Sequence, residues 1–191
     1  MKQEFRKKDD RELFALIKSD ERTAEQAFNE IYERYSPRVF AYCRRFLNNA
    51  ETARDVFQET FLRFLNYARN AENEKDLTNV ISFLLVVARN LCINEQRDEH
   101  KALVYSDEID VAGENREDTD EMLNLIKAAM DLLPSGLKET FILREYDGLS
   151  YQEIAEITNS SVPAVKTRIH RARQKIREIL TPYMQDMRSI K

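Results

Sequence analysis

Apolar residues recur at helical spacing along most of the 191-residue chain. From Met122, the segment "MLNLIKAAMDLL" has apolar side chains at positions i, i+3, i+4 and i+7, and "LKETFILREYD" repeats the pattern before it stops at Gly148. Three glycines and four prolines are too few for the many tight turns of a strand-rich fold. The pattern therefore predicts an all-α protein.

Two adjacent helices are predicted near the C-terminus. Ser150 and Glu153 form a capping box at the start of "SYQEIAEIT", and Ser161 can cap a second helix that has Pro163 in its first turn. The short polar segment "NSS" connects them. Two helices joined by such a turn, the second long and basic, have the outline of a helix-turn-helix.

The second of these helices has two contrasting faces when its residues are placed about 100° apart. An apolar stripe is predicted to pack on the preceding helices, and it consists of Val165, Ile169, Ala172, Ile176 and Ile179. The polar side and its flanks include Lys166, Thr167, His170, Arg171, Arg173 and Gln174. Such a mixture of donors, acceptors and cations suits base edges and DNA phosphates. The alternatives are a helix that binds a membrane surface or a partner protein, and a structural helix with a solvated face.

Helices are also predicted in the N-terminal half. Thr23 with Gln26, and Asn48 with Glu51, have capping-box spacing and predict two helix starts. Pro37 is expected to begin a new helical turn between them.

The helix that follows Asn48 has a polar side which its own core does not need. Its apolar side consists of Val56, Phe57, Phe61, Phe64 and Leu65. The opposite side places acids around one apolar residue, and it consists of Asp55, Gln58, Glu59 and Leu62. Such a patch suits docking to another protein, and the alternative is a solvated helix face with an incidental exposed leucine.

The most apolar stretch, "VISFLLVVARNLCINEQR", is predicted to be a buried helix. One narrow stripe of it is different, because it carries an aromatic ring, two amides and a cation: Phe83, Asn90, Asn94 and Arg97. A polar loop is expected just before it, from Asn66 to Asn79, and it contains Tyr67 and Arg69. These side chains could stack on and hydrogen-bond unpaired bases, or they could be capping and polar rim residues.

Charge divides the chain into three parts. Residues 98–121 contain ten acids and two bases, a net charge of −8, in a protein whose total is −4. We therefore expect helical domains at residues 1–97 and 122–191, joined by an acidic flexible linker at 98–121. This linker is either a solvated spacer or an acidic segment that occupies a basic channel in a partner.

Several classes of protein are disfavoured by the sequence. The glycines are too dispersed for a phosphate loop, and the two histidines have no metal-ligand spacing with the cysteines, so we expect no enzyme, no metal and no cofactor. No leader or membrane-spanning run is visible, which favours a cytoplasmic protein without direct membrane insertion. Cys43 and Cys92 are expected to be reduced thiols in hydrophobic cores.

The strings "ARDVFQETFLRFL", "SFLLVVARNLCINEQR" and "GLSYQEIAEITNSSVPAVKTRIHRARQKI" resemble, in order and spacing, the extracytoplasmic-function (ECF) group of the sigma-70 family of bacterial transcription initiation factors. The resemblance spans nearly the whole chain and is most specific in the C-terminal part. It implies a protein that binds RNA polymerase core enzyme and directs it to particular promoters. It also implies an anti-sigma factor as a partner.

The resemblance also implies roles for the patches described above. Region two would dock on the core polymerase through Asp55, Gln58, Glu59 and Leu62. It would capture the melted minus-10 element with Tyr67, Phe83, Asn90, Asn94 and Arg97. Region four would read the minus-35 element through Lys166, Thr167, His170, Arg171 and Arg173. Phe83 stands where many members have Trp, and Lys166 stands where others carry Arg.

Two other functions compete with a sigma factor. One is a stand-alone helix-turn-helix regulator with an N-terminal sensing or dimerisation domain. An α/β receiver pattern or a long heptad repeat would favour this function, and neither is visible in the sequence. The other is a nucleic-acid-processing enzyme, which would need a carboxylate or metal cluster.

Overall fold

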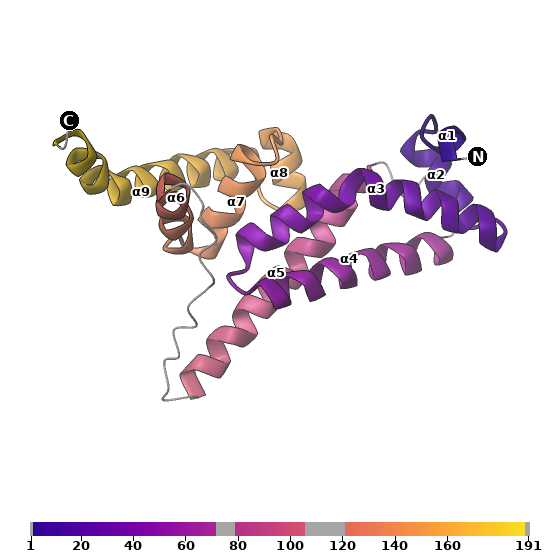
Figure 1. Ribbon diagram of the computed structural model, residues 1–191, viewed down its shortest axis with the longest axis horizontal. Coiled ribbons are helices and arrows are strands. Elements are labelled where there is room, and N and C mark those ends of the chain that lie inside the picture. The colour runs from indigo at the N-terminus through magenta and orange to yellow at the C-terminus, as the bar shows by residue number, and fades with distance from the viewer. Residues whose placement is uncertain (1, 72–78, 106–120, 190–191) are drawn as a thin grey trace. The chain divides into compact units, whose positions relative to one another are not determined.

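The structure is a computed structural model that describes the backbone of residues 2–71, 79–105 and 121–189, and the side chains of residues 4–71, 79–97 and 122–185. The described residues form nine helices and contain no strand (Figure 1). This confirms the predicted all-α fold. Contacts divide the chain into two compact units, Met1–Asn94 and Glu95–Lys191.

The first unit is built around two long helices. Its elements are α1 (Lys2–Phe5), α2 (Asp10–Leu16), α3 (Glu21–Phe46), α4 (Ala50–Asn70) and the first part of α5 (Val80–Tyr105). The helices α1, α2 and α4 all pack on α3. The largest fully buried side chains of this unit are Leu13, Phe14, Ile17, Ile31, Tyr42, Phe46, Phe64, Leu84 and Leu85. Cys43 and Cys92 are also buried in it as free thiols, as predicted.

The second unit is a smaller helical cluster. It contains α6 (Glu121–Asp131), α7 (Ser135–Glu145), α8 (Tyr151–Ile157) and α9 (Val162–Ser189), and α9 contacts each of the other three. Its core includes Ile142, Leu143, Ile154, Val165, Ile169 and Ala172. Gly148 lies between α7 and α8 with a φ of 66°, a conformation that suits glycine and ends the preceding helix.

Side-chain caps fix the helix starts, and two of them differ from the prediction. The helix α3 is capped by Asp20, whose carboxylate accepts a hydrogen bond from the Thr23 backbone N–H at 3.2 Å, so Thr23 itself is not the cap. A hydrogen bond from the Thr23 side chain, and secondarily this backbone hydrogen bond, lower the pKa of Asp20. The helix α4 is capped by Asn49 rather than Asn48. The predicted capping box of Ser150 and Glu153 at α8 is confirmed.

Three predicted boundaries also move because helices continue further than expected. Pro37 is exposed inside an unbroken α3, where its missing N–H removes one backbone hydrogen bond without ending the helix. The helix α4 runs to Asn70, so Tyr67 and Arg69 lie in a helix and not in a loop. Residues 98–105 continue α5 into the expected linker, since "KALVY" includes good helix formers. The other linker residues at 106–120 lie outside the described residues.

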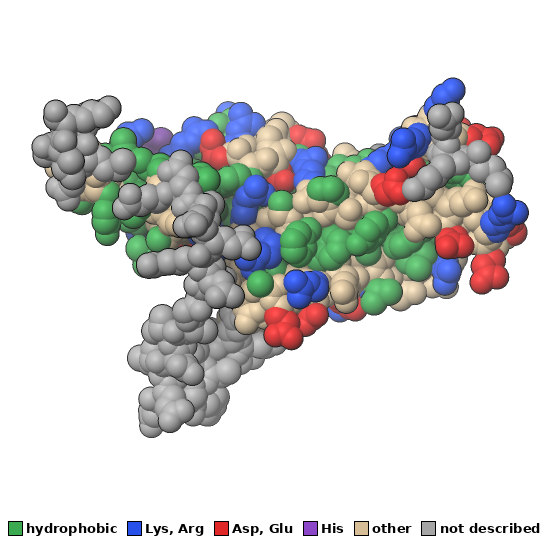
Figure 2. Space-filling view, viewed as in Figure 1, with side chains coloured by type: hydrophobic (Ala, Val, Ile, Leu, Met, Phe, Trp, Pro, Cys, Tyr) green, Lys and Arg blue, Asp and Glu red, His purple; other side chains and the backbone are tan. Residues whose placement is uncertain are grey.

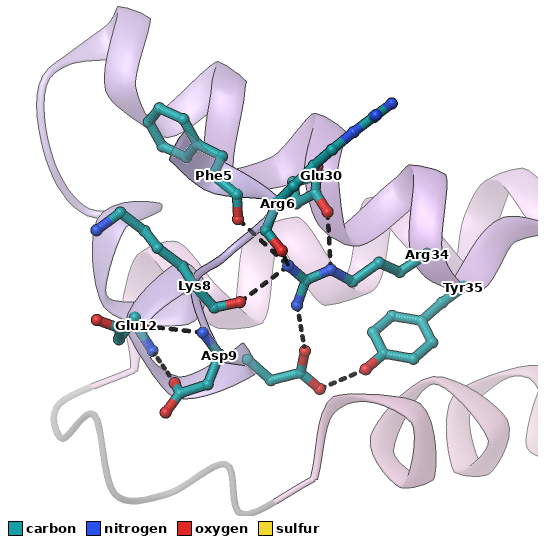
Figure 3. Close-up of polar contacts among 9 residues, drawn as sticks. Phe5, Arg6, Lys8, Asp9, Glu12, Glu30, Arg34 and Tyr35 are labelled. Carbon is teal, nitrogen blue, oxygen red and sulfur yellow. Dashed lines mark hydrogen bonds and ion pairs between the residues drawn. The ribbon is translucent and has the colours of Figure 1, made fainter. Parts of the chain in front are cut away.

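One arginine holds the N-terminal segment on α3 (Figure 3). Arg34 donates to Glu30 at 2.8 Å, to Asp10 at 3.2 Å, and to three backbone carbonyls of residues 5, 6 and 8. The hydroxyl of Tyr35 donates to the second carboxylate oxygen of Asp10 at 2.5 Å. Burial raises the pKa of Tyr35, and the hydrogen bond to Asp10 raises it further. Asp10, the first residue of α2, is therefore fixed by two side chains of α3.

Candidate nucleic-acid and partner-binding surfaces

The helices α8 and α9 form the predicted helix-turn-helix. Asn159 adopts a left-handed conformation, with a φ of 47°, directly after α8. The backbone N–H of Ser160 bonds the carbonyl of Ala155 at 2.9 Å, and that of Asn159 bonds Glu156 at 3.3 Å. This pattern is a Schellman motif with Asn in the position that usually holds Gly. The Ser161 hydroxyl then accepts from the Ala164 N–H at 3.4 Å, and only four residues separate the end of α8 from the start of α9.

The two faces of α9 lie as the helical periodicity predicts. Val165, Ile169 and Ala172 are at most 1% exposed, and Ile176 is also buried, whereas Ile179 at the edge is only partly buried. Lys166, Thr167, His170 and Arg171 are all exposed, and we call these four residues the reading face. Lys, Arg and His side chains lie along α9 in Figure 2. One helix therefore presents a continuous polar surface above a buried apolar stripe.

Neighbouring side chains hold the cations at the edges of the reading face. The ammonium of Lys166 lies 5.6 Å from the centre of the Tyr151 ring, and the guanidinium of Arg144 lies 4.8 Å from the same ring. Arg173 donates to Glu145 of α7 through two nitrogens, at 2.6 and 3.0 Å. By contrast, His170 and Arg171 make no hydrogen bond or ion pair with the described residues, so their polar groups are available to a ligand. The sequence did not indicate Glu145 or Tyr151, because these contacts depend on how α7 and α8 pack.

A second polar surface in the first unit is built on aromatic rings. Tyr67 of α4 and Phe83 of α5 are stacked, with ring centroids 4.6 Å apart and an angle of 27° between the planes. Phe64 packs against the edge of Phe83 at 6.0 Å, and Phe14 of α2 lies 6.1 Å from Tyr67. Because Phe14 is fully buried while Tyr67 and Phe83 are partly exposed, the stacked pair rests on the core. The sequence did not indicate Phe14, since no periodicity connects α2 with α4 and α5.

The two predicted amides lie further along α5 and are exposed. Asn90 accepts a hydrogen bond from Arg89 at 3.1 Å, which leaves its amide NH₂ available as a donor. Asn94 is exposed one turn later, and Arg97 is exposed three residues beyond it in the same helix. We call Tyr67, Phe83, Asn90 and Asn94 the capture surface. It can offer an aromatic platform and amide donors and acceptors to a planar base.

The predicted docking face of α4 is also exposed. Leu62 is 56% exposed, Asp55 and Gln58 are exposed, and Glu59 accepts from Arg63 at 2.7 Å in an ion pair that leaves both groups near solvent. Figure 2 shows hydrophobic side chains on the surface over α3 and α4. Tyr32 of α3 is also exposed, at 39%. An exposed leucine between carboxylates can bind a complementary apolar and basic surface of another protein.

Two kinds of site are absent from the residues that the structure describes. They include no group of three or more His, Cys, Asp or Glu side chains placed to hold a metal ion. Across the same residues, none of the helices has the length and apolar character needed to cross a membrane.

The fold and the reading face define a helix-turn-helix DNA-binding protein, and comparisons with known proteins identify the family. The family models for sigma-70 region 2 and sigma-70 region 4 match residues 31–102 and 123–176. The ECF RNA polymerase sigma factor SigW of Bacillus subtilis is 31% identical over 180 residues, covering 86% of this chain and 94% of SigW. The RNA polymerase sigma factor CarQ of Myxococcus xanthus is 29% identical over 162 residues, covering 82% of this chain and 91% of CarQ. The chain belongs to the ECF group of the sigma-70 family.

Solved structures show the same fold. The sigma factor RpoE from Bartonella quintana, solved with the anti-sigma factor NepR, matches with a TM-score of 0.68 and 23% identity, over 81% of this chain and 96% of that chain. CnrH, solved with the cytosolic domain of CnrY, matches with a TM-score of 0.69 and 22% identity, over 91% and 97% of the two chains. The family matches and the similarity to SigW make the protein a promoter-directing transcription initiation factor, and the stand-alone regulator is not favoured.

Proposed function

We propose that the protein binds bacterial RNA polymerase core and contacts two elements of one promoter, the minus-35 element with its reading face and the melted minus-10 element with its capture surface. The observation that carries this proposal is the exposed polar face of α9, which lies above a buried stripe within a helix-turn-helix. In this assignment, residues 1–97 form region two and residues 122–191 form region four, with the acidic segment at 98–121 between them.

Arg171 is proposed as the principal base-reading residue of the minus-35 element. Its guanidinium is exposed and has no ion-pair partner among the described residues, so both edges of its fork are available to a guanine in the major groove. His170 and Thr167 lie beside it on the same face. Lys166 and Arg173 flank the face, and their contacts with Tyr151 and Glu145 restrict the positions that the two cations can take. Cations at these edges suit DNA phosphates as well as bases.

The capture surface is proposed to hold an unpaired base of the minus-10 element. Tyr67 and Phe83 already stack on one another, so a flipped base would add to an existing aromatic pair instead of ordering a mobile ring. Asn90 and Asn94 supply amides on the same helix as Phe83, and Arg97 follows them with a cation for the backbone. Unpaired bases expose edges that such amides can read.

The exposed face of α4 is proposed as the docking site for the core enzyme. Asp55, Gln58 and Glu59 surround Leu62, which the first unit leaves in solvent. An anti-sigma factor is proposed as a further partner, because the relatives RpoE and CnrH were solved in complex with an anti-sigma factor and with CnrY. We also propose that the protein acts in the cytoplasm with RNA polymerase and performs no catalysis of its own.

Run-off transcription with purified bacterial core polymerase tests this function. The holoenzyme first selects promoters from a DNA library randomised around two elements, and the selected DNA is then transcribed. We expect initiation at a fixed distance from a selected sequence pair, and none with core polymerase alone. A protein that neither binds core nor directs initiation to any selected sequence would contradict the proposal.

A matched pair of variants tests the docking face in the same assay. Leu62→Asp should abolish binding to core polymerase, because it places a charge in the centre of the apolar contact. Leu123→Asp, which changes another exposed leucine in the second unit, serves as the control. Equal core binding by both variants would exclude α4 as the docking site.

A further inference from the structure

The short helix α2 lies outside the part of the chain that matches a sigma family model. The region 2 match begins at residue 31, whereas α2 covers Asp10–Leu16. Nevertheless, Leu13 and Phe14 of α2 are fully buried, and Ile17 at its end is 2% exposed. The helix is therefore part of the core of the first unit.

Two contacts connect α2 and the segment just after it to the C-terminal part of α4. The ring of Phe14 lies 6.1 Å from Tyr67 and 6.2 Å from Phe64. The ammonium of Lys18 donates a hydrogen bond to the carbonyl of Ala71, the C-terminal capping residue of α4. A cation at this position satisfies a helix carbonyl that has no partner within the helix, and it interacts favourably with the helix dipole.

This last turn of α4 positions Tyr67. The Ala71 N–H bonds the Tyr67 carbonyl at 2.9 Å, so the two residues belong to the same hydrogen-bonded turn. Tyr67 in turn stacks on Phe83, and the two rings form the aromatic part of the capture surface. If this turn frays, Tyr67 loses its backbone support, and the stacked pair has to be ordered at the moment a base binds.

The position of α2 is itself fixed from α3. Asp10 accepts hydrogen bonds from both Arg34 and Tyr35, and its neighbour Asp9 forms a capping box with Glu12 (Figure 3). The chain of contacts therefore runs from Arg34 through α2 to Lys18 and Phe14, and from there to Tyr67.

We infer that Lys18 is a positioning residue for capture of the unpaired minus-10 base, because it secures the last turn of α4 that carries Tyr67. This inference rests on the proposed function of the capture surface. The side chain of Lys18 is exposed, and its hydrogen bond is to a backbone carbonyl. It can therefore be substituted without creating a cavity in the core. The sequence did not single it out, since its partner lies 53 residues away.

The test compares Lys18→Ala with Lys7→Ala in complete holoenzyme. Lys7 is an exposed lysine of the same N-terminal segment, and its side chain makes no hydrogen bond or ion pair with the described residues, so this control removes the same charge. The probe is a promoter selected by the wild-type holoenzyme, with a fluorescent adenine analogue on the non-template strand of its minus-10 element. Strand opening is followed by the fluorescence of that base, and binding to core polymerase and to a minus-35 duplex is measured in parallel.

We expect Lys18→Ala to lower the equilibrium constant for strand opening by about threefold to tenfold, the effect of losing one hydrogen bond of ordinary net strength. Lys7→Ala should open the promoter like the wild type, and Lys18→Arg should restore opening because Arg can also donate to the carbonyl. Hydrogen exchange should be faster at the Ala71 amide in Lys18→Ala, with unchanged binding to core and to the minus-35 duplex.

The outcomes separate this inference from the function on which it rests. Wild-type holoenzyme that opens no selected promoter would contradict the proposed function. Normal opening by Lys18→Ala, or an equal defect in Lys7→Ala, would overturn the positioning role while the function stands. A defect that Lys18→Arg does not restore would also overturn it.

Discussion

The reading face and the capture surface are constructed in different ways. The reading face lies on one helix, α9, and the residues beneath it form a simple buried stripe of Val165, Ile169 and Ala172. The capture surface combines α4 and α5, and Phe14 of α2 supports it from below. A substitution on the reading face can therefore change DNA contacts alone, whereas one behind the capture surface also changes the packing of the first unit. The four predictions below test this difference in order of expected size.

The largest effect is expected from Arg34→Ala. This change removes hydrogen bonds to two carboxylates and three carbonyls and leaves Glu30, which is 8% exposed, without its arginine. We expect the free energy of opening of α3 to fall by about 2 to 4 kcal/mol, a typical result of breaking a partly buried ion pair and its hydrogen bonds. Site-resolved hydrogen exchange on the complete chain measures this, and amides of α9 should keep their protection.

Arg11→Ala is the control for this measurement. Arg11 is an exposed arginine of α2 that makes no hydrogen bond or ion pair with the described residues, so its removal chiefly changes the charge. A loss of protection in α3 as large as that of Arg34→Ala would show that charge, and not the hydrogen bonds, stabilises the N-terminal segment.

Arg171→Ala is expected to change base preference without changing stability. The loss should be about 1 to 3 kcal/mol at the contacted base pair of the minus-35 element, and small at other positions. Binding to a set of single-base variants measures it, and Arg171→Lys shows how much depends on the fork rather than the charge. An unchanged preference in Arg171→Ala would exclude base reading, and a large fall in melting temperature would contradict the independence of the reading face.

Asn94→Ala is expected to weaken strand opening by about 1 kcal/mol, the usual net contribution of one hydrogen bond. Strand opening is measured with the fluorescent adenine analogue on the non-template strand of the minus-10 element. Asn29→Ala, which removes an exposed amide from α3, is the control. Normal opening and an unchanged minus-10 preference in Asn94→Ala would remove this residue from the capture surface.

The smallest effect is expected from Glu145→Gln. The change breaks an ion pair in which Arg173 is about half exposed, and such pairs contribute about 0.2 to 1 kcal/mol. The Glu145 side chain would then no longer compete with DNA phosphates for the guanidinium of Arg173. We therefore expect slightly tighter binding to non-specific DNA and a steeper dependence of the DNA affinity on salt concentration. Glu178→Gln removes the same charge from α9 without breaking an ion pair and is the control. Weaker binding would show that Glu145 instead positions Arg173 for DNA.

Most of the second unit could be predicted from its sequence, although α7 begins at Ser135, two residues before the predicted segment. Its helix starts, its helix-turn-helix and its buried stripe all depend on capping and periodicity, which involve residues close together in the chain. In the first unit, the same rules misplaced the caps of α3 and α4 by one to three residues and placed Tyr67 in a loop. Neighbouring residues offered equivalent caps there, and local rules could not choose between them.

The contacts that complete the capture surface could not be predicted for a different reason. Phe14, Lys18 and Arg34 contact partners that are distant in the chain, at separations such as 53 residues for Lys18 and Ala71. Periodicity shows which side of a helix is buried but not which helix covers it. For the same reason, the sequence could not distinguish Asp10 from any other acid in the first turn of a helix. Its hydrogen bonds with Arg34 and Tyr35 depend on how α2 packs on α3.

The left-handed Asn159 between α8 and α9 limits how this protein can evolve. Asn and Gly tolerate a φ of 47° there, whereas a β-branched residue would be strained and would change the angle at which α9 leaves the turn. In the proposed assignment, promoter preference can therefore diverge by substitutions at Arg171 or His170, which make no hydrogen bond or ion pair with the described residues. The turn at Asn159, which sets the direction of α9, tolerates few substitutions. New promoter specificities are therefore expected to arise from substitutions on α9 and not in this turn.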